Sequence, residues 1–273
     1  MPELPEVETV VRTLRPVLVG RTLQGVRQGK HHLRTPWQSA WNRLIPGSSI
    51  IDVTRRGKWI LIELSRPQYR LIVHLGMTGR LLVQQKTIAP STHTHLVFPL
   101  KENNEELRFH DPRRFGCVTI AKEAGSLRFA EEAELGPEPF DLTLADFSQS
   151  LMKSRRKVKA ILLDQSVVAG VGNIYADESL YESRIHPERL GTSLTRSEVS
   201  SLRKAIVKVL RHAIDSKGST IANFYYGDDE TGNFQNEFKA YGRTDEPCKR
   251  CGKPITCIRL GGRSTHFCSL CQR

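Results

Sequence analysis

The sequence predicts a mixed α+β protein with more than one domain. Between residues 48 and 121, short β-branched runs separated by turn signals indicate a β-sandwich or barrel. From about residue 146, apolar residues recur at helical spacing, and the chain closes with a small cysteine-rich module. A length of 273 residues is sufficient for two domains with separate cores.

The charge balance favours a polyanionic partner. Lys and Arg number 41 against 29 Asp and Glu, which gives a formal net charge of +12 and a pI near 9.6. This composition favours nucleic acid ahead of a membrane surface. No apolar run approaches a membrane span, and Glu3, Glu6 and Glu8 stand where a signal peptide needs basic and then apolar residues. We expect no membrane association and a cytoplasmic, reducing location in which the six cysteines form no disulfides.

The first predicted element is a helix that begins just after the N-terminus. Spacings of three and four residues relate Val7, Val10, Val11, Leu14, Val17 and Leu18, and Gly20 marks the end. Pro5 and Glu6 suit the first turn, whereas Pro16 should kink or shorten the last one. If Met1 is removed, Pro2 becomes a free secondary amine attached to a structured element. The alternative is a frayed terminus with no function.

The later elements follow in order. The predicted strands are SSIIDVT, KWILIEL, RLIVHL, LLVQ, HLVFPL, ELRFH and CVTIA. Residues 123–146 are acidic, contain LGPEPF and suggest a linker. Helical patterns then cover roughly 146–165, 173–184 and 195–217, and the glycine-broken turn QSVVAGVGN separates the first two.

Two CxxC pairs give the strongest local signal. Cys248, Cys251, Cys268 and Cys271, with 16 residues between the pairs, match the spacing of a four-cysteine zinc site. Four protein ligands leave no open position, so one structural Zn²⁺ per chain is expected; the alternative is chance or redox pairs. The intervening ITCIRLGGRSTHF predicts a hairpin with Arg263 at its turn, either solvated or in contact with phosphate. Cys117 and Cys257 are expected to pack as small hydrophobic residues.

Three further patterns each have a structural and a functional interpretation. Asn173 begins a predicted helix after Gly170 and Gly172. This glycine-rich helix start is either purely structural or a phosphate-binding site. KSRRKVK at residues 153–159 is either a solvated helix face or a phosphate-facing patch. Met77 and Phe115 lie in loops near arginines and belong either to the core edge or to a wedge inserted into DNA.

The motifs PELPEVE, HLGM, DPRRFG, LGPEP, VVAGVGNIYADE and CKRCG…RSTHFCSLCQ occur in this order along the chain. Together they resemble the bacterial formamidopyrimidine-DNA glycosylases, also called 8-oxoguanine DNA glycosylases, essentially from end to end. The resemblance implies an N-terminal β-sandwich with flanking helices at 1–135, a linker at 136–150, a helix-two-turn-helix domain at 151–238 and a zinc hairpin at 239–273. It also implies DNA in the cleft between the domains, and we expect a monomer.

The function implied by the resemblance is that of a bifunctional DNA glycosylase and AP lyase in base excision repair. Such enzymes flip out and excise oxidised purines (8-oxoguanine, formamidopyrimidines) from double-stranded DNA and cleave the resulting abasic site by β,δ-elimination. The implied catalytic residues are Pro2 as nucleophile, Glu3 as proton-handling group, Lys58 and Arg263. The implied DNA contacts are His93, Arg113, Arg155, Lys159, Asn173, Tyr241 and Arg263, and the void-filling residues are Met77, Arg113 and Phe115.

The substrate preference is less sharply defined. Ala222 stands in GSTIANFYYGDD, which matches the loop over the flipped base, where several relatives have a basic residue. The sister family that prefers oxidised pyrimidines begins PEGPE, so Leu4 favours purines. A zinc protein that binds DNA without cutting it is the other alternative, but a binder has no need of Pro2 and Glu3 at its N-terminus.

The chemistry explains why these residue types suit the reaction. A secondary amine that attacks the sugar C1′ gives an iminium that stays cationic, which acidifies the C2′ hydrogen. An α-amine has a reference pKa of about 8, against about 10.4 for lysine, and a helix N-terminus lowers it further. We expect Glu3 to act as general acid during ring opening. Glu6 is interpreted as a residue that complements the helix dipole, with support of the site as the alternative.

Overall fold

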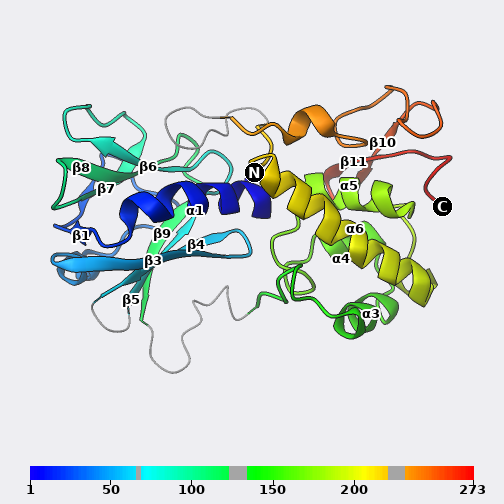
Figure 1. Ribbon diagram of the computed structural model, residues 1–273, viewed down its shortest axis with the longest axis horizontal. Coiled ribbons are helices and arrows are strands. Elements are labelled where there is room, and N and C mark those ends of the chain that lie inside the picture. Colours follow the sequence, from blue (N-terminus) through cyan, green and yellow to red (C-terminus); the bar gives the residue numbers. More distant parts are fainter. Residues whose placement is uncertain (66–68, 123–133, 221–230) are drawn as a thin grey trace. The chain divides into compact units, whose positions relative to one another are not determined.

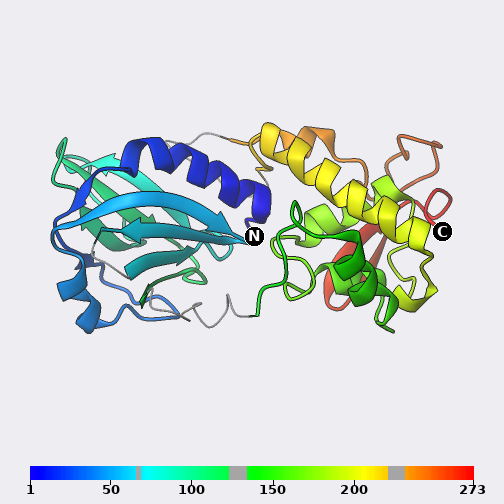
Figure 2. The same cartoon turned by 60° about the horizontal axis from the view of Figure 1, so that its bottom comes forward.

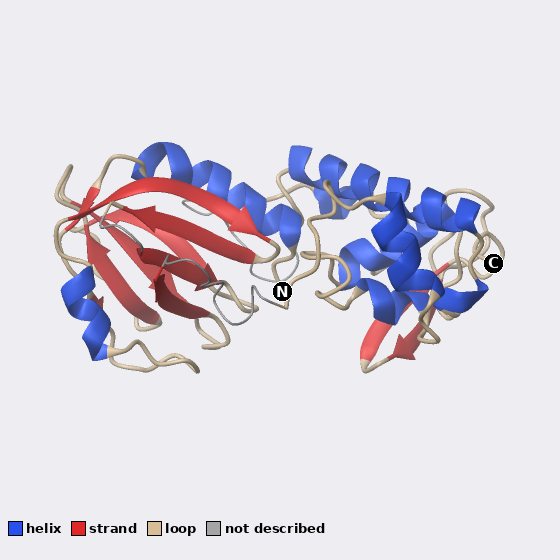
Figure 3. Ribbon diagram, turned by 90° about the horizontal axis from the view of Figure 1, so that it is seen from below, coloured by secondary structure: helices blue, strands red, loops and turns tan. Residues whose placement is uncertain are grey.

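The computed structural model describes residues 1–65, 69–122, 134–220 and 231–273 (Figure 1). The chain divides into two compact units: Met1–Ala133 with Ser219–Gly232, and Glu134–Gly218 with Asn233–Arg273. Figure 3 shows that strands predominate in the first unit and helices in the second. Ser219–Gly232 follows a helix of the second unit in sequence, yet it belongs to the first unit. Ala222 lies outside the described residues.

The first unit contains two antiparallel sheets. Its elements are α1 Leu4–Leu18, β1 Thr22–Leu23, β2 Arg27–Gln28, η1 Ser39–Leu44, β3 Ser48–Arg56, β4 Trp59–Leu64, β5 Tyr69–His74, β6 Arg80–Gln85, β7 Thr94–Pro99, β8 Glu105–His110 and β9 Cys117–Lys122. One sheet has the order β1-β3-β4-β5-β9 and the other β2-β7-β8-β6. All seven predicted runs form strands, whereas β1 and β2 have two residues each and are too short to show a periodicity.

The two sheets and α1 share one hydrophobic core, so the predicted β-sandwich is confirmed. Ile60 and Ile62 of β4 contribute to this core together with Phe98 of β7 and Phe109 of β8. Leu61, between the two isoleucines, belongs to a separate cluster on the opposite face of the sheet. This alternation is the period-two pattern of a strand. Helix α1 lies along the strands, and its buried face belongs to the same core (Figure 2).

Helix α1 begins and ends for the predicted reasons. Pro5 lies in the first turn, and Glu6 is the acidic residue of that turn. The helix continues through Pro16 and ends at Leu18, two residues before Gly20, the predicted end, which has a φ of +87°.

The second unit packs helices around a central one. Its elements are α3 Leu144–Met152, α4 Val158–Leu162, α5 Asn173–Ser183, η2 Gly191–Ser193, α6 Arg196–Asp215, η3 Phe234–Glu237, β10 Thr256–Leu260 and β11 Arg263–Phe267. Residues 174–181 of α5 are all buried, which marks α5 as the core helix. Helix α6 begins at a capping box, in which Thr195 and Glu198 each bind the other's backbone N–H. Its buried residues recur every three or four positions, as predicted.

The single helix predicted over 146–165 is wrong. The segment between α3 and α4 is not helical, because its backbone pairs with residues 189–192. The Val158 N–H donates to the Arg189 carbonyl at 2.7 Å, and the Gly191 N–H donates to the Arg156 carbonyl at 3.0 Å. A Cβ at Gly191 would lie 2.2 Å from the Leu151 carbonyl oxygen, so this approach requires glycine. The KSRRKVK segment is therefore not one continuous helix face.

The cysteine-rich module contains the predicted hairpin. Strands β10 and β11 pair antiparallel, and Gly261 and Gly262 connect them at positive φ. Cys257 on β10 is exposed, so the expectation that it packs as a buried hydrophobic residue is wrong. A two-stranded sheet covers one face at most, and Cys257 lies on its uncovered face. Cys117 is half-buried on β9. In the described part of the chain, no helix is long and apolar enough to cross a membrane.

Candidate active site and nucleic-acid interface

The start of α1 is an enclosed site rather than a frayed end. Pro2 is buried, and Glu3 exposes 3% of its surface at the position that caps the helix. Lys58, 7% exposed, follows the positive-φ Gly57 in the β3–β4 hairpin. The pKa of the Met1 amine is lowered by burial; the Glu3 and Glu6 carboxylates raise it, and the cations of Lys58 and Arg113 lower it. The terminal amine and these charged side chains therefore influence one another directly.

Glu6 joins the N-terminus to a distant segment of the same unit. One oxygen, Oε2, accepts the Glu3 backbone N–H at 2.9 Å. The other, Oε1, accepts both the N–H of Ser219 at 2.7 Å and its hydroxyl at 2.9 Å. Glu6 is 2% exposed, so these bonds form away from water. These contacts favour support of the site over a role confined to the helix dipole.

Two apolar side chains project from loops of the first unit. Met77 is 40% exposed in the loop after β5, and Phe115 is 48% exposed between β8 and β9. The Arg113 guanidinium lies 4.9 Å from the centre of the Phe115 ring. Neither side chain belongs to the buried core, so the core-edge interpretation does not hold. His93 is also exposed, with its ring beside that of His110.

Three of the predicted phosphate-binding residues of the second unit, Asn173, Tyr241 and Arg263, lie at the zinc hairpin. The exposed Arg263 opens β11, and the carbonyl of the next residue, Ser264, accepts the Asn173 side-chain amide at 3.1 Å. Asn173 is the first residue of α5. Tyr241 lies beside the His266 ring, with 5.1 Å between the ring centroids. Arg155 is exposed in the connection between α3 and α4.

Lys159 differs from these residues because its ammonium is buried. Its Nζ lies 2.8 Å from the Ser264 carbonyl, 2.8 Å from the Thr265 hydroxyl and 2.6 Å from Asp177 Oδ1. Lys159 is 1% exposed, so two hydrogen bonds and one ion pair hold its ammonium away from water. Asp177 Oδ2 also accepts the His266 backbone N–H at 2.9 Å. The resulting network fastens α4 and α5 to β11, next to Arg263.

A second buried carboxylate supports the Tyr241 segment. Glu178 accepts the backbone N–H groups of Lys239, Ala240 and Tyr241 at 2.8–3.1 Å. Burial raises the pKa of Glu178, while these three donors lower it in part. Helix α5 thus positions both the Arg263 and the Tyr241 segments.

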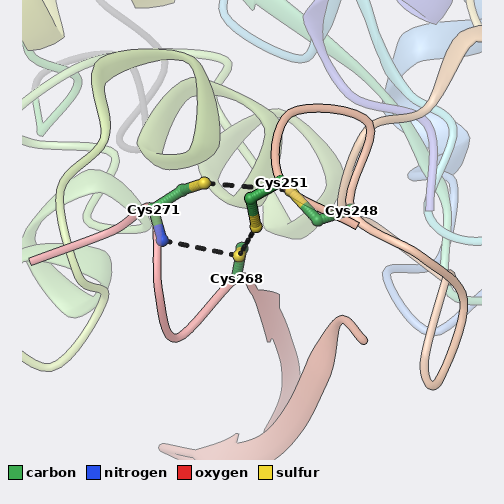
Figure 4. Close-up of side chains that lie close together, drawn as sticks. All are labelled: Cys248, Cys251, Cys268 and Cys271. Atoms are coloured by element: carbon green, nitrogen blue, oxygen red, sulfur yellow. Dashed lines mark hydrogen bonds between the residues drawn. The ribbon is translucent and has the colours of Figure 1, made fainter. Parts of the chain in front are cut away.

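The four predicted cysteines come together, as Figure 4 shows. Their sulfur atoms all lie within 4.8 Å of one another; Cys248 and Cys271 are 4.0 Å apart, and Cys251 and Cys268 are 3.5 Å apart. A tetrahedral Zn²⁺ with bonds of about 2.3 Å separates its sulfur ligands by about 3.8 Å. The cluster therefore fits a zinc ion held by four thiolates.

Comparison with known families identifies the chain. The formamidopyrimidine-DNA glycosylase N-terminal domain matches residues 1–118, and the H2TH domain of the same glycosylases matches residues 135–225. A zinc finger found in FPG and IleRS matches residues 245–273. The chain belongs to the formamidopyrimidine-DNA glycosylase family.

Formamidopyrimidine-DNA glycosylases from several bacteria match the whole chain. The one from Herpetosiphon aurantiacus is 46% identical over 276 residues, covering 100% of both chains. The one from Desulforamulus reducens is 41% identical and covers 100% of this chain and 99% of its own. This member is therefore an enzyme of DNA repair with a zinc-finger module.

Solved glycosylase structures share the fold. The MutM (Fpg) protein from Thermus thermophilus has a TM-score of 0.88 and 39% identity, covering 99% of this chain and 98% of that one. Wild-type Lactococcus lactis Fpg in complex with an N7-benzyl-Fapy-dG containing DNA has a TM-score of 0.91 and 36% identity, covering 100% of both chains. A complex of the same protein with abasic-site DNA has a TM-score of 0.89.

The sequence did not predict the buried residues that bind the segments carrying the candidate site residues. Asp111 and Asp177 lie inside DPRRFG and NIYADE, motifs whose basic residues and glycines gave the functional signal. His266 lies between the zinc cysteines, and Ser219 had no signal of its own. An acidic residue inside a basic motif was the available clue for the first two, because such a carboxylate requires partners when it is buried.

Proposed function

We propose that the protein is a bifunctional DNA glycosylase and AP lyase that acts on double-stranded DNA containing oxidised purines or abasic sites. In this proposal Pro2 is the nucleophile once Met1 has been removed. The observation that carries the proposal is the start of α1, where Pro2, Glu3 and Lys58 are buried and the Lys58 cation lowers the pKa of the terminal amine. A protein that only binds DNA does not require a terminal amine close to charged side chains.

The bond changes assign a role to each residue. The Pro2 nitrogen bonds to the sugar C1′ as the bond from C1′ to the base breaks, and the base leaves with a proton. Glu3 protonates the ring oxygen as the sugar opens to an iminium, a step of general acid catalysis. Loss of the C2′ proton then expels the 3′ phosphate, and a second elimination expels the 5′ phosphate. Lys58 and Arg263 bind the phosphates, and Lys58 also donates a proton.

In this proposal, exposed or half-buried groups of both units bind the DNA. We assign phosphate contacts to His93, Arg113, Arg155, Asn173, Tyr241 and Arg263, and filling of the vacated space in the duplex to Met77, Arg113 and Phe115. The exposure of Met77 and Phe115 supports this assignment, since apolar wedges offset the lost base stacking. Lys159 was predicted as a phosphate contact, but its buried bonds support a different use, namely fixing β11 beneath Arg263.

The zinc site serves structure in this proposal. Cys248, Cys251, Cys268 and Cys271 hold one Zn²⁺ per chain and fill all four tetrahedral positions, so no position remains for substrate. The bound metal fixes the loops on either side of the β10–β11 hairpin. The metal site thereby keeps Arg263 in place, and the metal itself takes no part in bond breaking.

Excision from defined duplexes tests the proposal. A duplex with 8-oxoguanine opposite cytosine should release the free base and yield two ends that both carry phosphate, as β,δ-elimination requires. Competition with a duplex that contains an oxidised pyrimidine separates the two substrate classes, and we expect the purine duplex to be used in preference. Tight lesion binding without base release would indicate a damage-binding protein. Preferential release of the oxidised pyrimidine would indicate a pyrimidine-specific glycosylase.

A further inference from the structure

Asp111 is a buried carboxylate at the centre of the loops that carry Met77, Arg113 and Phe115. It is 0% exposed, and both carboxylate oxygens accept hydrogen bonds. Oδ1 accepts the Thr78 hydroxyl at 2.6 Å and the Arg113 N–H at 3.2 Å. Oδ2 accepts the Gly116 N–H at 2.8 Å. One side chain therefore fastens the neighbours of Met77 and Phe115, and the backbone of Arg113, to a single point.

The backbone of Asp111 extends this connection to the strand that follows His93. The Asp111 N–H donates to the His93 carbonyl at 3.0 Å, and the Asp111 carbonyl lies 2.8 Å from His95 Nε2. His95 is 3% exposed, and its Nδ1 lies 2.9 Å from the His31 carbonyl. Asp111 is thus bonded to the start of β7 through its backbone and to the Met77 loop through its side chain.

The two loops also touch directly. A Cβ added at Gly76 would lie 2.4 Å from the Gly116 nitrogen, so only glycine permits this approach. Gly76 has a φ of +61°, a second reason for glycine there. A Cβ at Gly116 would lie 3.2 Å from Asp111 Oδ2. The close approach of Gly76 to Gly116 and the hydrogen bonds to the Asp111 carboxylate therefore join the two loops at the same place.

We propose that Asp111 is a positioning residue that joins the Met77 loop and the Arg113–Phe115 loop into one rigid wedge for insertion into the duplex. The proposal rests on the proposed function, in which these three side chains fill the space left by the flipped nucleotide. Unstacking a base step costs a few kcal/mol. Two independently moving loops would also lose conformational freedom on insertion, whereas loops ordered in advance by Asp111 avoid most of that loss.

The test uses Asp111→Asn in the full chain. Asparagine has one acceptor oxygen and an NH₂ group, so it cannot accept bonds on both sides. We expect excision of 8-oxoguanine from duplex DNA to slow by about tenfold or more, which corresponds to part of the unstacking cost. The fluorescence of a 2-aminopurine placed beside the lesion should show less unstacking with Asp111→Asn than with wild type. Cleavage of a single-stranded abasic oligonucleotide, which needs no wedge, should change by less than about twofold.

Thr78 supplies a milder variant with a matched control. Thr78→Val removes the hydroxyl's bond to Asp111 and the longer bond, 3.3 Å, that the hydroxyl accepts from the Arg113 N–H. It leaves the bonds from Arg113 and Gly116 to the Asp111 carboxylate, so it should give a smaller loss of the same kind. Thr78→Ser keeps the hydroxyl and should match wild type. In a Met77→Ala/Phe115→Ala background, Asp111→Asn should slow excision by less than about a further twofold, because coupled residues are not additive.

The outcomes separate this inference from the proposed function. Equal losses on duplex and single-stranded substrates, or no loss on the duplex, would overturn the positioning role. If wild type releases no base and cuts no strand, the proposed function fails. The 2-aminopurine signal on bound lesion DNA would still test the wedge, and an unchanged signal in Asp111→Asn would reject it.

Discussion

At the scale of single residues, the electrostatic surroundings of the N-terminal amine govern its reactivity. Burial lowers the pKa of the Met1 amine, Glu3 and Glu6 raise it, and Lys58 and Arg113 lower it. We expect the same groups to act on the Pro2 amine once Met1 is removed. A lowered pKa leaves a larger fraction of neutral nucleophile at pH 7 than a free terminus has, since its reference value is about 8.

This arrangement predicts opposite pH shifts for two substitutions. Lys58→Met removes a charge that lowers the amine pKa, so the acid limb of the covalent trapping rate should move to higher pH. Glu6→Gln removes a charge that raises it, so the limb should move to lower pH. Trapping rates from pH 5 to 9 measure both midpoints independently of the maximum rate. Shifts in the same direction would contradict the electrostatic account.

Glu3 gives a second prediction at this scale. Glu3→Gln should slow base release by about 10²–10⁴-fold, the range of general acid–base catalysis. Single-turnover release of 8-oxoguanine measures the effect. Glu8→Gln on the same helix is the control, because the Glu8 carboxylate pairs with Arg12 and Arg55. Excision by Glu3→Gln at the wild-type rate would remove Glu3 from the mechanism.

Sequence identifies Pro2, Glu3 and Lys58 through motifs, but it cannot identify what holds them. Glu6 binds Ser219, 213 residues away, and no local pattern predicts that pairing. Asp111 and Asp177 act through burial, which depends on the tertiary fold. The proposed reacting groups have a sequence signature because the chemistry requires their residue types, whereas the residues that support them depend on position in the fold.

At the scale of elements, the Lys159–Asp177 pair fastens α4 and α5 to the zinc hairpin. Its side chains are 1% and 0% exposed. Lys159→Met should lower the free energy of unfolding by about 3–5 kcal/mol, because it leaves Asp177 buried without its cation. Lys157→Met, which breaks the exposed pair with Glu188, should cost less than about 1 kcal/mol.

Denaturant unfolding of both variants measures these differences. Adding Asp177→Asn to Lys159→Met should cost less than the sum of the single changes, since the two groups share one interaction. Equal stabilities of Lys159→Met and Lys157→Met would contradict a structural role for the buried pair.

The element-scale predictions succeeded where the signal was local. Short β-branched runs between turn signals predicted β3 to β9, and apolar spacing predicted α1, α5 and α6. The helix expected over 146–165 failed, because its middle pairs with residues 189–192, a partner that periodicity cannot reveal. Gly191 permits that approach, yet in the sequence it has the appearance of any loop glycine.

At the scale of the whole molecule, the net charge of +12 predicts salt-dependent DNA affinity. Arg263→Ala should reduce the slope of log K against log salt concentration by about 1, as loss of one phosphate contact requires. Lys159→Met should leave the slope unchanged even where it weakens binding, because its ammonium faces Ser264, Thr265 and Asp177. Fluorescence anisotropy at several salt concentrations measures both. A reduced slope for Lys159→Met would restore it as a phosphate contact.

The central claim is that Pro2 forms the covalent bond to DNA. Borohydride reduction during reaction with a duplex containing 8-oxoguanine opposite cytosine, followed by mass spectrometry of the cross-linked peptide, tests it most directly. We predict one adduct, on the Pro2 nitrogen of a chain that lacks Met1. An adduct on Lys58, or no adduct from a processed chain that binds the lesion tightly, would contradict the claim.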